Sequence, residues 1–142
     1  FANMSLWERS TRVPLMFAGP GIQQQVITDP VGLIDIYPTA IDILGLPTNT
    51  ENAGRSLAPV LTQGQALPVE PQVSVYGEGN YAVIDPNHRY IRYADGSEEL
   101  YDLEKDPNEW VNLANDQSLA PVKERLRTYI PANPRADVMT GR

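Results

Sequence analysis

The chain contains no cysteine and only one histidine among its 142 residues. Without cysteine it can form no disulfide bond and no zinc site built on thiolates. With His88 as the lone imidazole, no pair of histidines exists at the spacing that holds a metal ion. No apolar run approaches the roughly 20 residues needed to cross a bilayer, so we expect no membrane partner. A periplasmic and a cytoplasmic location both fit this composition.

Basic residues are also scarce. The chain has 11 Lys and Arg against 18 Asp and Glu, a formal net charge of -7. A nucleic-acid partner calls for a basic stripe, so this balance argues against one. The hydrophobic fraction of 42% and the length suit one globular domain with a real core, and 13 prolines indicate short elements joined by many loops.

The first half of the chain alternates short apolar runs with turns. Residues 12–18 are apolar and are followed by Gly-Pro-Gly, which predicts a strand that ends in a turn. Residues 23–28 would extend this strand or form a second one. The next apolar stretch predicts a helix that starts near Asp35 as its cap, carries Pro38 in its first turn and ends at Gly45.

A short helix and a connection follow. Ser56 is placed to cap a helix over residues 57–61. Residues 62–72 carry two prolines and a glycine, which predicts an exposed connection and the best candidate for an internal boundary.

The second half predicts an antiparallel sheet of about four strands, because runs of aromatic and β-branched residues alternate with turns at 73–76, 81–84, 89–93 and 98–101. Asp95-Gly96 predicts a tight two-residue turn between the last two runs. Within residues 89–93, strand alternation puts Tyr90 and Ile91 on opposite faces.

Helical signals follow the sheet. Asp106 is suited to cap a helical turn, with Pro107 at its first position and Glu109 reaching back to the cap. Residues 118–130 predict a helix with Pro121 in its first turn and Lys123 on its solvated side. Its buried stripe would consist of Leu119, Val122, Leu126 and Tyr129.

Complete catalytic constellations are missing from the sequence. His88, a lone histidine at a strand edge, is more typical of a surface residue than of a catalyst. Glu98 and Glu99 are adjacent in a strand, so they point to opposite faces and cannot share a proton or a cation. Gly77-Glu78-Gly79 is too short for a phosphate loop. Alone, these residues predict local structure rather than chemistry.

Three ordered segments resemble the sulfatases of the alkaline phosphatase superfamily. They are residues 5–22 (SLWERSTRVPLMFAGPGI), residues 31–46 (VGLIDIYPTAIDILGL, followed by GRSL at 54–57) and residues 88–114 (HRYIRYADGSEELYDLEKDPNEWVNLA). The nearest resemblance is to the branch that contains choline sulfatase and iduronate sulfatase. It implies an α+β chain in which residues 1–70 end the catalytic α/β domain. Residues 71–142 would form a C-terminal subdomain with a four-stranded antiparallel sheet packed against a C-terminal helix.

The resemblance also implies chemistry that this sequence does not carry. Such sulfatases use a formylglycine, made within a C/S-x-P-x-R motif, and a calcium ion that polarises the sulfate. The motif is absent here, so the nucleophile and the calcium ligands are expected before Phe1. Many relatives have a sulfate-binding lysine where this chain has Asn3, which can donate a hydrogen bond but brings no charge. Glu8 and Arg12 match positions near the site, with packing roles.

Two functions from different classes follow. In the first, the chain is the C-terminal part of a sulfatase that hydrolyses sulfate esters; it is inactive alone and needs the N-terminal part of the same sulfatase or self-association. Proteolytic processing into two chains that stay together is a variant of this hypothesis. In the second, the chain is a stand-alone, non-catalytic module derived from sulfatases that acts by self-association or partner binding.

Overall fold

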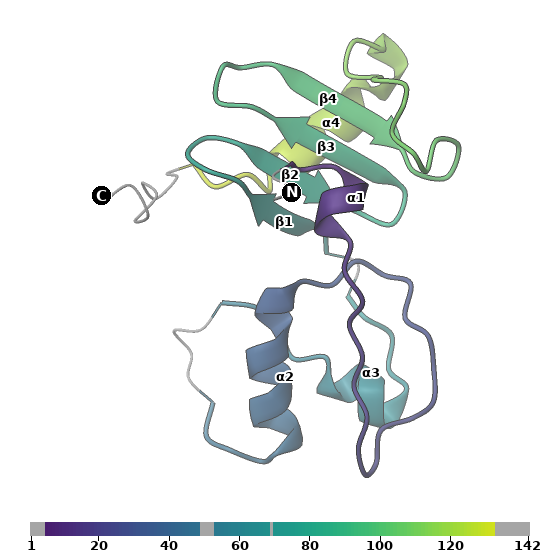
Figure 1. Ribbon diagram of the computed structural model, residues 1–142, viewed down its shortest axis with the longest axis vertical. Helices are drawn as coiled ribbons and strands as arrows, with labels where there is room; N and C mark the ends of the chain where they lie inside the picture. The colour runs from purple at the N-terminus through teal and green to yellow at the C-terminus, as the bar shows by residue number, and fades with distance from the viewer. Residues whose placement is uncertain (1–4, 49–52, 69, 133–142) are drawn as a thin grey trace. The chain divides into compact units, whose positions relative to one another are not determined.

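The computed structural model describes residues 5–48, 53–68 and 70–132. The chain divides into two compact units, one formed by residues up to Val13 together with those from Pro71 onward, the other by Pro14–Glu70 (Figure 1). Each unit has its own apolar core, so each is described by itself.

The first unit is built on the four-stranded antiparallel sheet that the sequence predicts, with the strands in chain order. The strands are β1 (Gln72–Val75), β2 (Tyr81–Ile84), β3 (His88–Arg92) and β4 (Glu98–Asp102). Each strand pairs with its neighbour along the chain, because short turns can join only antiparallel strands. The fold class, a small α+β arrangement with a sheet that contacts a C-terminal helix, is therefore confirmed.

The turn between β3 and β4 is one residue longer than the sequence predicted. The Tyr93 N–H donates to the Ser97 carbonyl, and the Gly96 N–H donates to the Tyr93 carbonyl, at 2.9 and 3.0 Å. Three residues thus lie in the loop, and of the predicted pair only Gly96 has a positive φ, of 86°. Such a loop is typical of a type I turn closed by a left-handed residue, in which Asp95 needs no positive φ.

Strand alternation divides the sheet's side chains between two cores. Val83, Tyr90 and Leu100 point to one face and pack with Leu126, while Ile91 and Tyr101 point to the other. The predicted opposition of Tyr90 and Ile91 is confirmed. Leu126 belongs to α4 (Ala120–Arg127), which follows the 3-10 helix η2 (Gln117–Leu119) and lies across β2 and β3 (Figure 1).

The stripe predicted for this helix is correct except at its end. Val122 packs against the core around Leu126, but Tyr129 is 42% exposed and Ile130 packs in its place. The difference arises because α4 ends at Arg127, so the helical spacing no longer applies beyond it. Lys123 was predicted to be solvated and instead bonds to Glu98, at 2.9 Å.

The second unit contains short helices joined by extended segments. The 3-10 helix η1 (Leu33–Asp35) runs into α2 (Ile36–Ile43), and α3 (Ala58–Gln63) follows. Residues 12–18 and 23–28 were predicted as strands, and this is wrong: both are extended without strand pairing. A strand needs a neighbouring strand for its backbone hydrogen bonds, and within the described residues neither segment pairs with one; Gln23 instead donates its backbone N–H to the Leu61 carbonyl of α3, at 2.8 Å.

Asp35 organises this unit from a buried position, 1% exposed. It occupies the cap position of α2, as predicted, but its carboxylate accepts from the backbone N–H groups of Gly32 and Arg55, each at 2.9 Å. The backbone at Gly54 comes so close that an added Cβ would lie 2.4 Å from the Ile34 carbonyl oxygen. This loop leads into α3, where Ser56 accepts from the Ala58 N–H at 3.1 Å.

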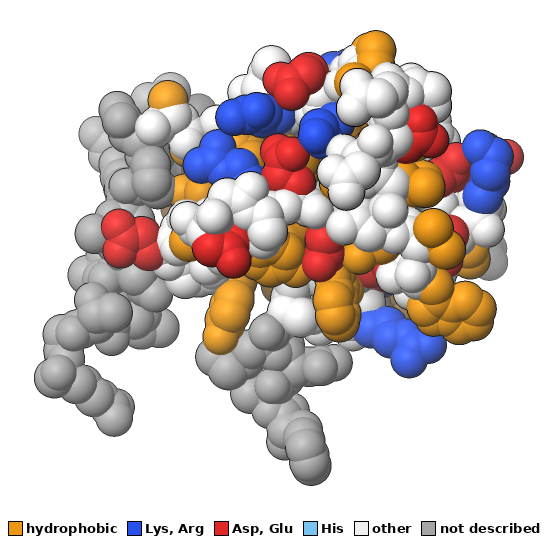
Figure 2. All heavy atoms as spheres, turned by 90° about the horizontal axis from the view of Figure 1, so that it is seen from above, with side chains coloured by type: hydrophobic (Ala, Val, Ile, Leu, Met, Phe, Trp, Pro, Cys, Tyr) orange, Lys and Arg blue, Asp and Glu red, His pale blue; other side chains and the backbone are white. Residues whose placement is uncertain are grey.

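Charged side chains of both signs are intermixed on the face of the molecule seen from above, with hydrophobic side chains beside them (Figure 2). Within the described ranges, no helix has the length and apolar character required to cross a bilayer.

Candidate binding site beside a buried arginine

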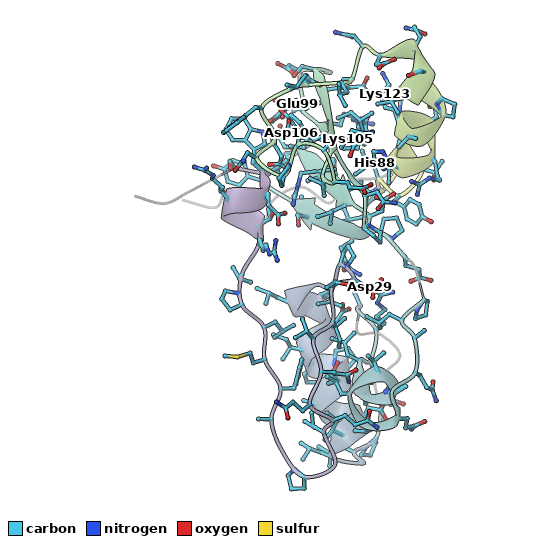
Figure 3. The ribbon with its side chains drawn as sticks, turned by 90° about the vertical axis from the view of Figure 1, so that its right-hand side faces the viewer. Asp29, His88, Glu99, Lys105, Asp106 and Lys123 are labelled. Carbon is cyan, nitrogen blue, oxygen red and sulfur yellow. The ribbon has the colours of Figure 1, made fainter. Side chains whose placement is uncertain are left out.

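Of the residues that the sequence singled out for chemistry, the structure brings none together as a catalytic pair. Asn3, the predicted substrate-binding residue, lies outside the described residues. His88 lies at the start of β3 with its Nδ1 atom 3.7 Å from Asp85. Glu98 and Glu99 lie on opposite faces, as predicted: Glu98 binds Lys123 on the α4 side, and Glu99 lies on the side of α1 (Glu8–Thr11) (Figure 3).

Arg89 is the charged residue that sequence reasoning passed over. Its side chain on β3 is only 2% exposed. The guanidinium donates to the Leu6 carbonyl at 3.0 Å and to the Thr11 hydroxyl at 2.9 Å. It also pairs with Glu8, and its Nε atom lies 2.6 Å from a carboxylate oxygen of Glu109. These bonds hold α1 and the segment before it on the sheet.

Glu109 completes this cluster from an unusual backbone position, with φ of 59°. Its carboxylate accepts from the Glu8 N–H at 2.8 Å, and its side chain is 4% exposed. Burial raises the pKa of Glu109, and the hydrogen bond from the Glu8 N–H and the charge of Arg89 offset only part of this rise. The predicted reach of Glu109 back to a helix cap at Asp106 is therefore wrong, because the carboxylate neutralises Arg89 instead.

The segment around Asp106 is a turn rather than a helix. Asp106 still caps backbone groups: its carboxylate accepts from the N–H groups of Trp110 and Val111, at 2.7 and 2.8 Å. This leaves the Trp110 side chain 79% exposed.

A second buried carboxylate, Asp85, closes the turn between β2 and β3. It accepts from the N–H groups of Asn87 and His88, at 2.8 and 2.6 Å, and pairs with Arg125 of α4. Although burial raises the pKa of Asp85, the hydrogen bonds from Arg125 and from these two N–H groups outweigh it, and the pKa lies below its usual value. The contacts of Asp85 and His88 are structural.

A pocket opens on the side of the sheet opposite α4. Its volume is about 250 Å³, and it is lined by Ser5, Leu6, Trp7, Tyr76, Asn80 and Tyr93. None of these side chains carries a charge. Three of the lining residues belong to the segment that Arg89 holds, and the other three lie at or in the turns after β1 and β3. The pocket thus lies between that segment and this end of the sheet.

The floor of the pocket is fixed by contacts between these two turns. The Asn80 amide accepts from the Ala94 N–H at 3.0 Å and donates to the Glu78 carbonyl at 3.2 Å. Gly79 has φ of 79°, and a Cβ added there would lie 3.0 Å from the Cβ of Ala94. The close approach requires a glycine, so the two turns are held in one arrangement.

The aromatic wall is fixed as well. The Trp7 indole N–H donates to Glu99 at 2.8 Å, and the Tyr101 hydroxyl donates to the same carboxylate at 3.0 Å. With its polar atom bonded, the Trp7 ring remains 47% exposed, and Tyr76 is 41% exposed. Burial and the neighbouring charge of Glu99 raise the pKa of Tyr93 to about 12, so its hydroxyl stays protonated at neutral pH. The pocket thus presents fixed, uncharged aromatic surface.

The sequence did not predict this pocket, because its lining combines segments that lie far apart along the chain. Alternation along residues 89–93 puts Tyr93 on the face of Ile91, but Trp7 comes from a distant part of the sequence. The bonds of Glu99, Arg89 and Glu109, together with the packing of Leu6 against Ile91 and Tyr101, bring that segment to the sheet.

The calcium ion that the resemblance implied finds no fit here. Across the described ranges, no three Asp, Glu or His side chains gather in a way that could hold a metal ion. The described residues thus contribute hydrogen bonds and ion pairs that position the chain, and a surface suited to binding.

Comparison with known proteins defines the class. The sequence model of the family "N-sulphoglucosamine sulphohydrolase, C-terminal" matches residues 1–134. The chain belongs to this family of sulfatase C-terminal regions, and the resemblance stated from its three segments is confirmed.

Individual relatives of the chain are sulfatases as well. The chain is 39% identical to a sulfatase from Formosa agariphila, over 92% of the chain and 26% of the relative. It is 35% identical to a Δ4,5-hexuronate-2-O-sulfatase from Bacteroides thetaiotaomicron, over 90% of the chain and 29% of the relative. A solved structure of a 2-O GAG sulfatase matches 86% of the chain and 32% of its own length, with a TM-score of 0.68 and 32% identity. The chain spans between a quarter and a third of these proteins.

Proposed function

We propose that this chain is the C-terminal part of an enzyme that hydrolyses the sulfate esters of carbohydrates. The observation that carries the proposal is the match of the sulfatase C-terminal family to residues 1–134. The names of two relatives, a hexuronate-2-O-sulfatase and a 2-O GAG sulfatase, support a sulfated sugar as the substrate.

In this proposal the chain contributes structure and substrate contacts, while the nucleophile comes from elsewhere in the enzyme. The sequence holds no C/S-x-P-x-R motif from which a formylglycine is made. The formylglycine and the calcium ion would thus belong to the N-terminal part. Alone, the chain would be inactive.

The partner we propose is the N-terminal part of the same sulfatase. Large apolar side chains are exposed in the unit formed by Pro14–Glu70, among them Met16 at 88%, Val26 at 90% and Leu44 at 68%. A contiguous exposed apolar patch is typical of an interface, and we propose that these side chains belong to one. Residues 13–18 also take part in no strand pairing within the described residues, so a neighbouring strand could bind their backbone groups. Self-association of the chain is the alternative occupant of the same surface.

The test compares the chain alone with the chain joined to, or co-expressed with, the N-terminal part that precedes it in its gene. We expect release of sulfate from a 2-O-sulfated hexuronate disaccharide only when both parts are present. Sulfate release by the 142-residue chain alone would contradict the proposal, as would its absence from the assembled enzyme.

Interface variants separate the two occupants. Val26→Glu places a charge in the proposed interface, and Gln117→Glu places the same charge at an exposed polar residue outside the unit formed by Pro14–Glu70. We expect Val26→Glu to lower co-purification of the two parts and Gln117→Glu to leave it unchanged. A chain that forms stable dimers, and binds no N-terminal part, would favour self-association instead.

A further inference from the structure

We propose that the pocket lined by Ser5, Leu6, Trp7, Tyr76, Asn80 and Tyr93 binds a pyranose ring of the carbohydrate substrate. The proposal rests on the proposed function for the identity of the sugar, and on the structure for the site. It assigns these residues a role in holding the sugar rather than in the chemical step.

The lining of the pocket suits one sugar ring. Pockets that take drug-sized ligands have volumes of roughly 300–1,000 Å³, so about 250 Å³ has the scale of a single ring. The C–H face of a pyranose is apolar and packs on an aromatic ring, and Trp7 and Tyr76 expose such rings. The amide of Asn80 and the hydroxyl of Ser5 lie in the same lining, and such groups hydrogen-bond to sugar hydroxyls.

The absence of charged side chains from the lining limits which ligands the pocket can bind. All six lining residues are neutral, so the pocket offers no ion-pair partner to a bare anion such as free sulfate. An uncharged ring face is the part of a sulfated sugar that such a lining would hold. The sulfate would then lie outside the pocket.

Hydrogen bonds also hold the walls of the pocket in place before any ligand arrives. Glu99 fixes the Trp7 ring, the Asn80 amide ties the two turns together, and Arg89 bonds the Leu6 carbonyl from a buried position. A site with fixed walls loses little conformational entropy on binding, which favours affinity for a small ligand.

The experiment is an NMR titration of the ¹⁵N-labelled 142-residue chain with an unsulfated hexuronate disaccharide. The chain has two tryptophans, so each gives one indole N–H signal. We expect the Trp7 signal to shift and the signal of Trp110, which does not line the pocket, to stay in place. Shifts of neither signal at millimolar sugar would overturn the proposal, as would shifts produced equally by inorganic sulfate alone.

Paired variants provide the second measurement. Trp7→Ala and Tyr76→Ala each remove one aromatic wall, and we expect roughly tenfold weaker binding or more, on the scale of one aromatic contact. Trp110→Ala and Tyr129→Ala are the controls, because these residues are as exposed as the pocket residues or more so, at 79% and 42%. Equal loss in the control variants would overturn the proposal.

Hydrolysis by the assembled enzyme distinguishes this proposal from the function on which it rests. We expect Tyr76→Ala to raise KM for the sulfated disaccharide roughly tenfold, with a smaller effect on kcat, and Tyr129→Ala to change neither. An active enzyme whose KM is insensitive to Tyr76→Ala would overturn the pocket while the proposed function stands. Sugar binding at Trp7 in an assembly that releases no sulfate would uphold the pocket and contradict the proposed function. If a variant of the isolated chain fails to fold, the KM measured on the assembled enzyme tests the pocket instead.

Discussion

Replacing Arg89 by methionine should destabilise the sheet unit more than any other single change of charge in it. Arg89 is 2% exposed and neutralises Glu8 and Glu109, whose side chains are 21% and 4% exposed. Methionine keeps much of the side-chain length but leaves the buried Glu109 without its cation, and leaves Glu8 with only the exposed Arg12, at 3.2 Å. Removing one partner of a buried ion pair costs about 3–5 kcal/mol, because a buried charge then has no compensation.

The expected loss is large enough to measure by urea unfolding. With an m value of about 2 kcal/mol/M, a loss of 3–5 kcal/mol moves the midpoint down by about 1.5–2.5 M. Intrinsic fluorescence is the appropriate signal, since both tryptophans belong to the unit that contains the sheet. Arg127→Met is the matched control: Arg127 pairs with Glu124 at 3.7 Å, with both side chains at least half exposed, and such pairs contribute at most about 1 kcal/mol.

The pH dependence tests the cause of the loss. The pKa of Glu109 is raised in the folded chain, so its contribution to stability is present at low pH and is lost as the pH rises through that pKa. Without Arg89 the penalty for a charged Glu109 increases, and the gap between wild type and variant should widen from acidic to neutral pH. Adding Glu109→Gln to Arg89→Met should narrow the gap at neutral pH. A loss below about 1 kcal/mol, or one independent of pH, would refute the reasoning.

Three further predictions concern other parts of the chain. Leu126→Ala, at a side chain with 0% exposure, should cost about 2–5 kcal/mol in the same urea assay; a loss below about 1 kcal/mol would show that the core does not depend on α4. Gly54→Ala should lower the midpoint of thermal unfolding followed by far-UV circular dichroism, because φ is 92° and the new Cβ would meet the Ile34 carbonyl; an unchanged midpoint would contradict that geometry. Asp85→Asn should be less stable than wild type at neutral pH, and because the pKa of Asp85 is lowered, the difference should vanish as the pH falls through that pKa; a difference that persists in acid would refute the role of its charge.

The sheet was predictable because its signals are local. Each strand has a run of aromatic or β-branched residues, and each turn has its own signal: glycines after β1 and β3, and Asp85-Pro86-Asn87 after β2. The strands β1 to β4 therefore follow from windows of a few residues. Alternation also placed Glu98 and Glu99 on opposite faces. The length of the turn at Asp95-Gly96 was less accessible, because an Asp-Gly pair suits loops of two and of three residues and the pairing of Arg92 with Glu98 decides between them.

The prediction of a strand over residues 12–18 was wrong because a strand also depends on a distant partner, which is not a local signal. The run has the composition of a strand, but composition does not supply the neighbour that a strand requires. Local patterns also misassigned Glu109, since Asp106-Pro107-Asn108-Glu109 has the composition of a helix start and the positive φ of Glu109 has no signature in it. A buried arginine elsewhere in the chain decides where that carboxylate lies.

The candidate pocket was unpredictable on the same grounds, and its dependence on Arg89 follows from the contacts. Arg89 bonds the carbonyl of Leu6, and Trp7 is the next residue, so the aromatic wall stands where the buried cluster holds the backbone. Glu99 then fixes the ring itself from the neighbouring strand. Because a polar group buried without a partner is costly, the Leu6 carbonyl, Glu8 and Glu109 all favour the same docked position of this segment. The residues that stabilise the fold here are thus the residues that position the proposed sugar site. Substitution of Arg89 should therefore weaken sugar binding, although Arg89 is not itself one of the six lining residues.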